Sequence, residues 1–165
     1  MKIWRGLSCL AAVAVLAGCA SWGPRKEGEE ASVKWAQLPA AVQTAVKQQV
    51  PESAINKIEK ENEDGQVAYE VQVVKDGHKS EITVAADGRL LSVEEEVALA
   101  EVPAVVRQTV EAQAIGGKVA KIEKVTAKGQ TIYEARVKKN GKALEFSVAL
   151  DGKLTGTEDV TKEKD

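Results

Sequence analysis

The chain has 165 residues, 44% of them hydrophobic and 29% charged, and its 23 basic and 25 acidic residues give a formal net charge of −2. A mixed, slightly acidic charge of this kind has no electrostatic footprint for nucleic acid or for anionic lipid headgroups, so we expect neither as a partner of the surface as a whole. With only two cysteines, the composition also excludes a disulfide-rich scaffold.

The first 18 residues have the pattern of a secretory signal peptide. Lys2 and Arg5 form a basic start, and the apolar stretch from Leu7 to Gly18 carries no charge. This stretch is well short of the roughly twenty residues that a membrane-spanning helix needs. Residues 1–18 are therefore predicted to be removed, which leaves 21 basic and 25 acidic residues.

The end of this segment, Leu16-Ala17-Gly18-Cys19, resembles the lipobox of bacterial lipoproteins. The resemblance implies that Cys19 becomes the first mature residue and carries acyl chains such as palmitate, and two or more chains anchor a protein stably to a membrane. The alternative is an ordinary signal peptide with a cysteine near its cleavage site by chance. Because Ala20 rather than an aspartate follows Cys19, we expect outer-membrane sorting, facing the periplasm, in a host with two membranes.

Residues 19–36 are polar and rich in turn formers, so we predict a flexible tether between the acylated cysteine and the folded part. Trp22 is placed to lie at the lipid interface, whereas Trp35 is expected to pack under the first helix. Cys9 is lost with the signal segment, which leaves Cys19 as the one cysteine of the mature chain. A disulfide, a cysteine nucleophile and a zinc–cysteine site are therefore excluded.

The rest of the chain is one pattern used twice. Positions 38–95 align with positions 102–159 at a constant offset of 64 residues, without insertion or deletion, and 23 of the 58 pairs are identical. A fixed period of this length indicates one supersecondary unit in two copies. We predict a first repeat over residues 37–97 and a second over residues 98–161.

Each repeat opens with a predicted helix. Apolar residues recur along one face at the spacing of an amphipathic helix, in Leu38, Ala41, Val42, Ala45, Val46 and Val50, and in Val102, Val105, Val106, Thr109, Val110 and Ala114. Pro39 and Pro103 fit the first helical turn. Pro51 and the pair Gly116-Gly117 end the two helices.

Four strand signals follow each helix. The first, around 55–60 and 119–125, alternates poorly, which indicates a bulge or an edge position. In the second, Tyr69 and Tyr133 are predicted to face the core. The residues predicted to be buried in the last two strands are Ile82, Val84, Ala86 and Leu90, and in the second copy Phe146, Val148, Leu150 and Leu154.

Hairpin signals separate the strands, at Asp76-Gly77 and Asn140-Gly141 and again at Asp87-Gly88 and Asp151-Gly152. The predicted fold class is therefore α+β, a tandem repeat of an α-β-β-β-β unit. Each unit is a helix packed on a four-stranded antiparallel meander, and the two units are expected to pack together.

Four motifs occur in this order: Leu-Pro-Ala-Ala-Val at the helix start, a Lys-Ile-Glu strand, a Tyr-Glu-Val strand and a closing Asp-Gly-Arg-Leu-Leu. The series resembles the PepSY-like domain, a family also described as resembling the beta-lactamase-inhibitor protein fold, and covers about 38–97 and 102–160. The resemblance implies a secreted or envelope location, tandem copies, and a role in binding or restraining other proteins, notably peptidases. It implies no catalytic residue.

Candidate chemical sites are few. His78, the single histidine, aligns with Lys142 after a turn, which favours an exposed position over a metal ligand. For the acidic run Glu94-Glu95-Glu96, which aligns with Glu158-Asp159-Val160, a solvated charge run is favoured over calcium binding. The recurring glutamates are interpreted as fold residues paired across strands with lysines, in Glu59 and Glu123, and in Glu70 and Glu134.

Neither a Ser-His-Asp set, a Cys-His pair nor a phosphate-binding glycine loop occurs in the sequence, so we predict no enzyme activity and no catalytic, cofactor or metal residue. The leading interpretation is a lipid-anchored envelope protein that binds another protein or a peptide along its sheet. The alternatives are an inhibitor or chaperone of a secreted peptidase, and a divalent-ion or small-molecule sensor that uses the acidic patch. Few aromatic anchors remain for a tight inhibitory interface, because Tyr69, Tyr133 and Phe146 are assigned to the core.

The expected packing of the two repeats can be tested by truncation. A copy of about sixty residues buries a thin core and is marginally stable alone. We expect the fragment 20–98 to be soluble but to melt without cooperativity in circular dichroism or calorimetry. A sharp transition at the temperature of the full chain would contradict joint packing.

Overall fold

A computed structural model describes residues 31–63, 66–75 and 77–162. The predicted signal peptide, the lipidation site Cys19 and Trp22 lie outside the described residues. The chain divides into two compact units near residues 95 and 96, so that each unit holds one of the two repeats. Among the described residues, no helix has the length and apolar character needed to cross a membrane.

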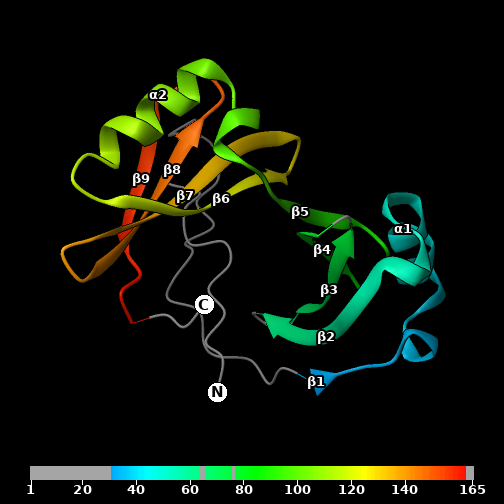
Figure 1. The fold of residues 1–165 in the computed structure, drawn as a ribbon. Helices are drawn as coiled ribbons and strands as arrows, with labels where there is room; N and C mark the ends of the chain where they lie inside the picture. Colours follow the sequence, from blue (N-terminus) through cyan, green and yellow to red (C-terminus); the bar gives the residue numbers. More distant parts are fainter. Residues whose placement is uncertain (1–30, 64–65, 76, 163–165) are drawn as a thin grey trace. The chain divides into compact units, whose positions relative to one another are not determined.

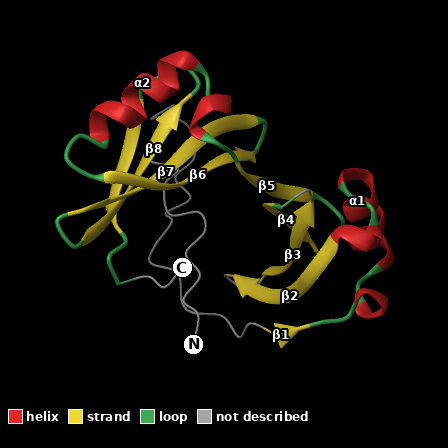
Figure 2. Cartoon of the chain, in the orientation of Figure 1, coloured by secondary structure: helices red, strands yellow, loops and turns green. Residues whose placement is uncertain are grey.

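The first unit contains one α-helix and a meander of strands (Figures 1 and 2). Its elements are β1 (Ala31–Ser32), a 3-10 turn at Trp35–Gln37, α1 (Ala40–Gln49), a 3-10 turn at Glu52–Ala54, β2 (Ile55–Glu63), β3 (Gln66–Lys75), β4 (His78–Ala85) and β5 (Leu90–Glu96). Each strand pairs antiparallel with the next one along the chain. A register shift between Ile55 and Lys57 is the irregularity predicted for the first strand.

The second unit repeats this order. After a 3-10 turn at Leu99–Glu101, its elements are α2 (Ala104–Gln113), β6 (Lys118–Ala127), β7 (Gln130–Lys139), β8 (Lys142–Ala149) and β9 (Leu154–Asp159). Strands β6 to β9 follow one another in the sheet, with β7, β8 and β9 antiparallel. The predicted α+β class is confirmed, and the packing of the two units against each other stays a prediction.

Each helix buries two valines against the sheet of its own unit. Val42 and Val46 of α1, and Val106 and Val110 of α2, are completely buried. They pack in two separate clusters with the inward-facing strand residues, which in the first unit include Tyr69 and in the second Tyr133. The prediction that both tyrosines face the core is confirmed, since they are 8% and 6% exposed.

Residues 31–36, which the sequence predicted to be part of the tether, belong to the fold. Ala31 and Ser32 pair with Lys60 and Glu59 of β2, and the Val33 amide donates to the Ile58 carbonyl at 3.0 Å. The second unit repeats this contact at the same offset, where the Val97 amide donates to the Ile122 carbonyl at 3.0 Å. Backbone pairing requires no apolar pattern, so the side chains gave no signal for this strand. Trp35 packs against the core below α1 as predicted, with the Lys47 ammonium 5.4 Å from its ring centre.

Several residues predicted to be buried near the last turn of each repeat are exposed. Leu90, Leu150 and Leu154 are 41%, 52% and 38% exposed, Val105 of α2 is 48% exposed, and Ala41 and Ala86 are exposed as well. For the residues of the last two strands, the cause is a register shift at the same place in both copies, between Thr83 and Val84 and between Ser147 and Val148. Because side chains alternate along a strand, one extra residue reverses the faces on one side of the shift.

Beside this shift, a glycine in each copy lies directly against the helix. Gly88 has a φ of +89°, and a Cβ placed on it would lie 2.9 Å from the Ala41 carbonyl oxygen. Gly152 has a φ of +85°, and its Cβ would lie 2.9 Å from the Val105 carbonyl oxygen. Only glycine allows both this backbone conformation and this close approach. The turn therefore fixes the distance between the helix and the sheet.

Glycine substitutions should distinguish the cost of the backbone conformation from the cost of the close contact with the helix. Gly77 has a similar φ of +82° with nothing within 4 Å of its Cβ position. Gly77→Ala should cost about 1–2 kcal/mol through the backbone conformation alone. Gly88→Ala should cost a further ~1–3 kcal/mol, because the added methyl group pushes on the helix backbone. Urea unfolding followed by circular dichroism measures both values, and equal losses would contradict the close packing of turn and helix.

Candidate functional site

Four glutamates recur on the four strands of each repeat, on the face of the sheet that the helix does not cover. They are Glu59, Glu70, Glu81 and Glu94 in the first copy and Glu123, Glu134, Glu145 and Glu158 in the second. Strand pairing sets Glu59 opposite Glu70 and Glu81 opposite Glu94 in the first copy. In the second copy it sets Glu145 opposite Glu158. We call each set the carboxylate row.

The first copy buries its row more deeply than the sequence predicted. Glu70 is 2% exposed and Glu94 is 7% exposed. The interpretation of Glu94 as part of a solvated charge run is therefore wrong, while its neighbours Glu95 and Glu96 are partly exposed. A strand alternates its side chains between two faces, so adjacent acidic residues in β5 have different surroundings.

Short contacts hold both rows in place. Lys57 lies 2.6 Å from Glu59, and Lys121 lies 2.6 Å from Glu123, so each lysine is two residues before its glutamate on the same strand. These two ion pairs lie within a strand, whereas the sequence predicted pairs across strands. Glu70 accepts a hydrogen bond of 2.9 Å from the Gln72 side chain, also on its own strand.

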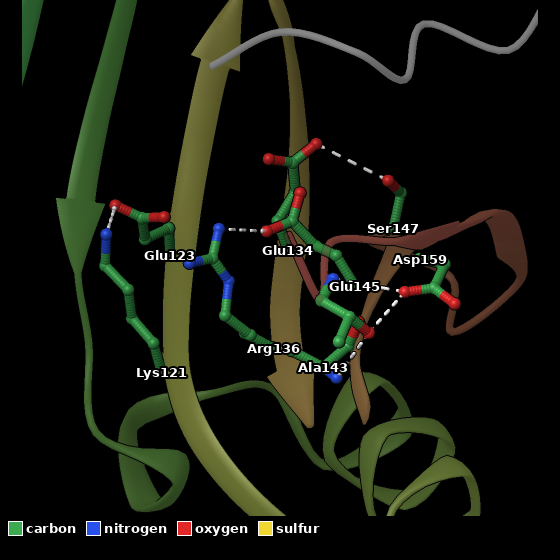
Figure 3. Close-up of polar contacts among 9 residues, drawn as sticks. Lys121, Glu123, Glu134, Arg136, Ala143, Glu145, Ser147 and Asp159 are labelled. Atoms are coloured by element: carbon green, nitrogen blue, oxygen red, sulfur yellow. Dashed lines mark hydrogen bonds and ion pairs between the residues drawn. The ribbon is translucent and has the colours of Figure 1, made fainter. Parts of the chain in front are cut away.

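The second copy has a guanidinium within its row (Figure 3). Arg136 of β7 donates to Glu145 of β8 at 3.2 Å, and both side chains are less than one-fifth exposed. Glu134 accepts a hydrogen bond from the Ser147 hydroxyl at 3.4 Å across the same pair of strands. Gln72 stands at the position of Arg136 in the first copy, so the cation is specific to the second.

Burial and like charges raise two carboxyl pKa values in this row. Burial, followed by the nearby Glu145 and Glu123 carboxylates, raises the pKa of Glu134 from 4.5 to about 7, although the Ser147 hydrogen bond acts in the opposite direction. Burial also raises the pKa of Glu145, although Arg136 acts in the opposite direction. Glu134 therefore exchanges its proton near neutral pH and can hold either a neutral or an ionised form.

The arrangement can bind a cationic group or take up a proton. Its donors and acceptors are carboxylates, a guanidinium and hydroxyls, and the Ser147 hydroxyl donates to the Glu134 carboxylate. Among the described residues, no three His, Cys, Asp or Glu side chains are placed to hold a metal ion together. The row can therefore recognise a partner by electrostatic attraction.

His78 and Asp159, the other candidate residues from the sequence, lie outside the carboxylate rows. His78 is exposed at the first position of β4, as predicted. Asp159 is exposed at the end of β9, where hydrogen bonds from Thr161 lower its pKa. Sequence reasoning missed Glu81 and Glu145 as members of the row, although both recur at the 64-residue offset. The sequence contained a signal for both residues. Glu81 pairs with Gln72, and Glu145 pairs with Arg136, in the same register in the two copies.

The chain belongs to the PepSY-like family. The family model, described as beta-lactamase-inhibitor-like and PepSY-like, matches twice, over residues 22–92 and 78–155. The two matches overlap, and they confirm the resemblance that the sequence motifs indicated. A search of the curated proteins gave no match.

Solved structures share the fold. A DUF2874 family protein from Bacteroides ovatus is 19% identical, with a TM-score of 0.64 over 78% of this chain and 92% of its own. A protein described as periplasmic from Bacteroides eggerthii is 20% identical, with a TM-score of 0.65 over 78% of this chain and 93% of its own. A BLIP-like protein from Bacteroides fragilis is 21% identical, with a TM-score of 0.58 over 77% of this chain and 90% of its own.

The raised pKa of Glu134 predicts a pH-dependent effect of Glu134→Gln. Between its unfolded pKa of 4.5 and its folded pKa of about 7, the folded state binds more protons, so the wild-type chain loses stability as pH rises through this window. The glutamine variant avoids this loss. It should match the wild type near pH 4.5 and exceed its unfolding free energy by up to about 3 kcal/mol at pH 8.

Urea unfolding at a series of pH values measures the difference. Glu111→Gln is the matched control, because Glu111 is exposed on α2 and its loss changes the charge equally. An advantage of Glu134→Gln that is the same at pH 4.5 and pH 8 would contradict the assignment.

Proposed function

We propose that this chain is a non-enzymatic, lipid-anchored protein of the cell envelope that binds another protein or a peptide along the helix-free face of its sheets. The carboxylate row supports this proposal, because it recurs on all four strands in both copies. Complementary charge favours a partner segment rich in lysine or arginine. In the second copy, where all four carboxylates are partly exposed, such a segment could lie across the strands and meet one carboxylate on each.

The location follows from the sequence. The lipobox ending at Cys19 supports acylation and an anchor in the outer membrane, facing the periplasm. One protein of the same fold, from Bacteroides eggerthii, is described as periplasmic. In this arrangement, the acyl chains hold the protein at the membrane while the folded repeats meet partners in the envelope.

Inhibition or chaperoning of a secreted peptidase is the second candidate function. The family description and the BLIP-like relative of the same fold favour it. A tight inhibitory interface is disfavoured, because the strand aromatic residues that could anchor it are buried. Tyr69, Tyr133 and Phe146 are each no more than 8% exposed.

Photo-crosslinking in the native membrane tests the leading proposal. A photoreactive residue at Gln130, an exposed position at the start of β7, lies on the strand that carries Glu134 and Arg136. The same group at Glu111 on α2 is the control on the opposite, helical side. We expect a discrete crosslinked envelope protein or peptide from position 130 and none from position 111. Equal products from both positions would contradict binding at the row.

Charge variants then test the chemistry of recognition. Glu123→Gln together with Glu158→Gln removes two partly exposed carboxylates of the second row. Crosslinking from position 130 should fall about tenfold or more, as expected for the loss of contacts to charged groups. The matched control is Glu52→Gln together with Glu111→Gln, two exposed glutamates outside the row. Equal yield from both pairs would overturn the role of the row, and inhibition of a peptidase by the control and not by the row variant would favour the second function.

A further inference from the structure

One glutamate of the second row is partly open to solvent, whereas its counterpart in the first row is enclosed. Glu134 and Glu70 lie at the same position of the second strand of each meander, β7 and β3. Glu70 is 2% exposed and accepts the 2.9 Å hydrogen bond from Gln72. Glu134 is partly exposed, and the Ser147 hydroxyl donates to it at 3.4 Å, which is long for such a bond. An external group therefore has access to Glu134.

Acidic side chains surround Glu134 on the other three strands of its meander. Glu123 of β6, Glu145 of β8 and Glu158 of β9 each act on it with their negative charge. The first two are drawn beside it in Figure 3. Helix α2 packs on the opposite face of the sheet, against the apolar core. The electrostatic surroundings of Glu134 on the helix-free face are thus dominated by like charge.

The two cations in this part of the row are engaged with other glutamates. The Lys121 ammonium lies 2.6 Å from Glu123, and the Arg136 guanidinium lies 3.2 Å from Glu145. Among the described residues, the contact that Glu134 makes is with a neutral hydroxyl. Glu134 is therefore a carboxyl group in acidic surroundings without a cationic partner of its own within the described residues.

Such a carboxyl group can be stabilised by a proton or by an external cation. Burial and the neighbouring carboxylates raise the pKa of Glu134 to about 7, so the proton is partly retained near neutral pH. An ammonium or guanidinium group within about 4–6 Å would favour the ionised carboxylate instead. The proton and the cation therefore compete for the same carboxyl group.

We propose that the cationic partner of the second row docks on Glu134 and displaces its proton to the solvent. This inference rests on the proposed function, and it identifies the residue on which the partner docks. The carboxyl O–H bond breaks, water or buffer takes up the proton, and the carboxylate accepts hydrogen bonds from the incoming N–H groups. The docking side chain must stay charged where Glu134 is ionised. Lysine and arginine meet this requirement, whereas histidine, with an ordinary pKa of about 6.5, does not.

Binding of a hexalysine peptide at different pH values tests this exchange, because its side chains stay charged from about pH 5.5 to about pH 8. Labelled hexalysine is titrated with the full chain in an uncharged detergent and followed by fluorescence anisotropy. Below about pH 7 the free chain holds more protons than the complex, so the affinity should rise by up to about tenfold per pH unit and then level off. Hexahistidine at about pH 8 should bind at least about tenfold more weakly than hexalysine.

Two variants make the test specific. Glu134→Gln should abolish the pH dependence and should bind at about pH 8 as weakly as the wild type does at about pH 5.5, since neither has a charge at this position. Glu111→Gln removes the same charge from an exposed position on α2 and should keep the pH dependence. Binding that is independent of pH in the wild type, or equally dependent on pH in Glu134→Gln, would overturn this inference and leave the proposed function standing. Absence of hexalysine binding at every pH would overturn both.

Discussion

The close contact between a glycine turn and a helix backbone determines how each repeat is built. At Gly88 and Gly152, a positive φ and a Cβ position 2.9 Å from a helix carbonyl leave room for no side chain. The turn that joins the last two strands is thereby held against the helix, and the helix stays on one face of the sheet. All the large aromatic side chains of the strands face that helix. The opposite face is left to polar residues, and those are the residues that carry the proposed functions.

Comparison of the two copies helps to distinguish the residues that the fold requires from those that serve binding. The glycine turns, the inward tyrosines and the carboxylate rows recur at the 64-residue offset. Arg136, Lys138 and Lys142 do not recur, since Gln72, Val74 and His78 stand in their place. Recurrence alone cannot distinguish a fold residue from a shared binding residue. Divergence within a shared backbone is more informative, because the first copy shows that the architecture forms without the cations.

The helices, the order of the strands and the inward tyrosines could be predicted, because helical and strand periodicities are local properties of the sequence. Leu90 and Leu154 were wrongly predicted to be buried because a single extra residue shifts the register opposite Thr83 and Ser147. The amino-acid composition of these strands does not reveal such a shift. Strand β1 was missed because backbone pairing does not depend on side-chain type. The carboxylate rows could have been found by following all recurring glutamates across the predicted strands.

The protonation of Glu134 links binding at the carboxylate row to pH. Glu134 titrates near neutral pH because burial and the nearby Glu145 and Glu123 carboxylates disfavour its charge. A cationic partner segment at the row would favour the ionised form, so its binding would release a proton from Glu134 and strengthen as pH rises through 7. Such a link requires no movement of the backbone.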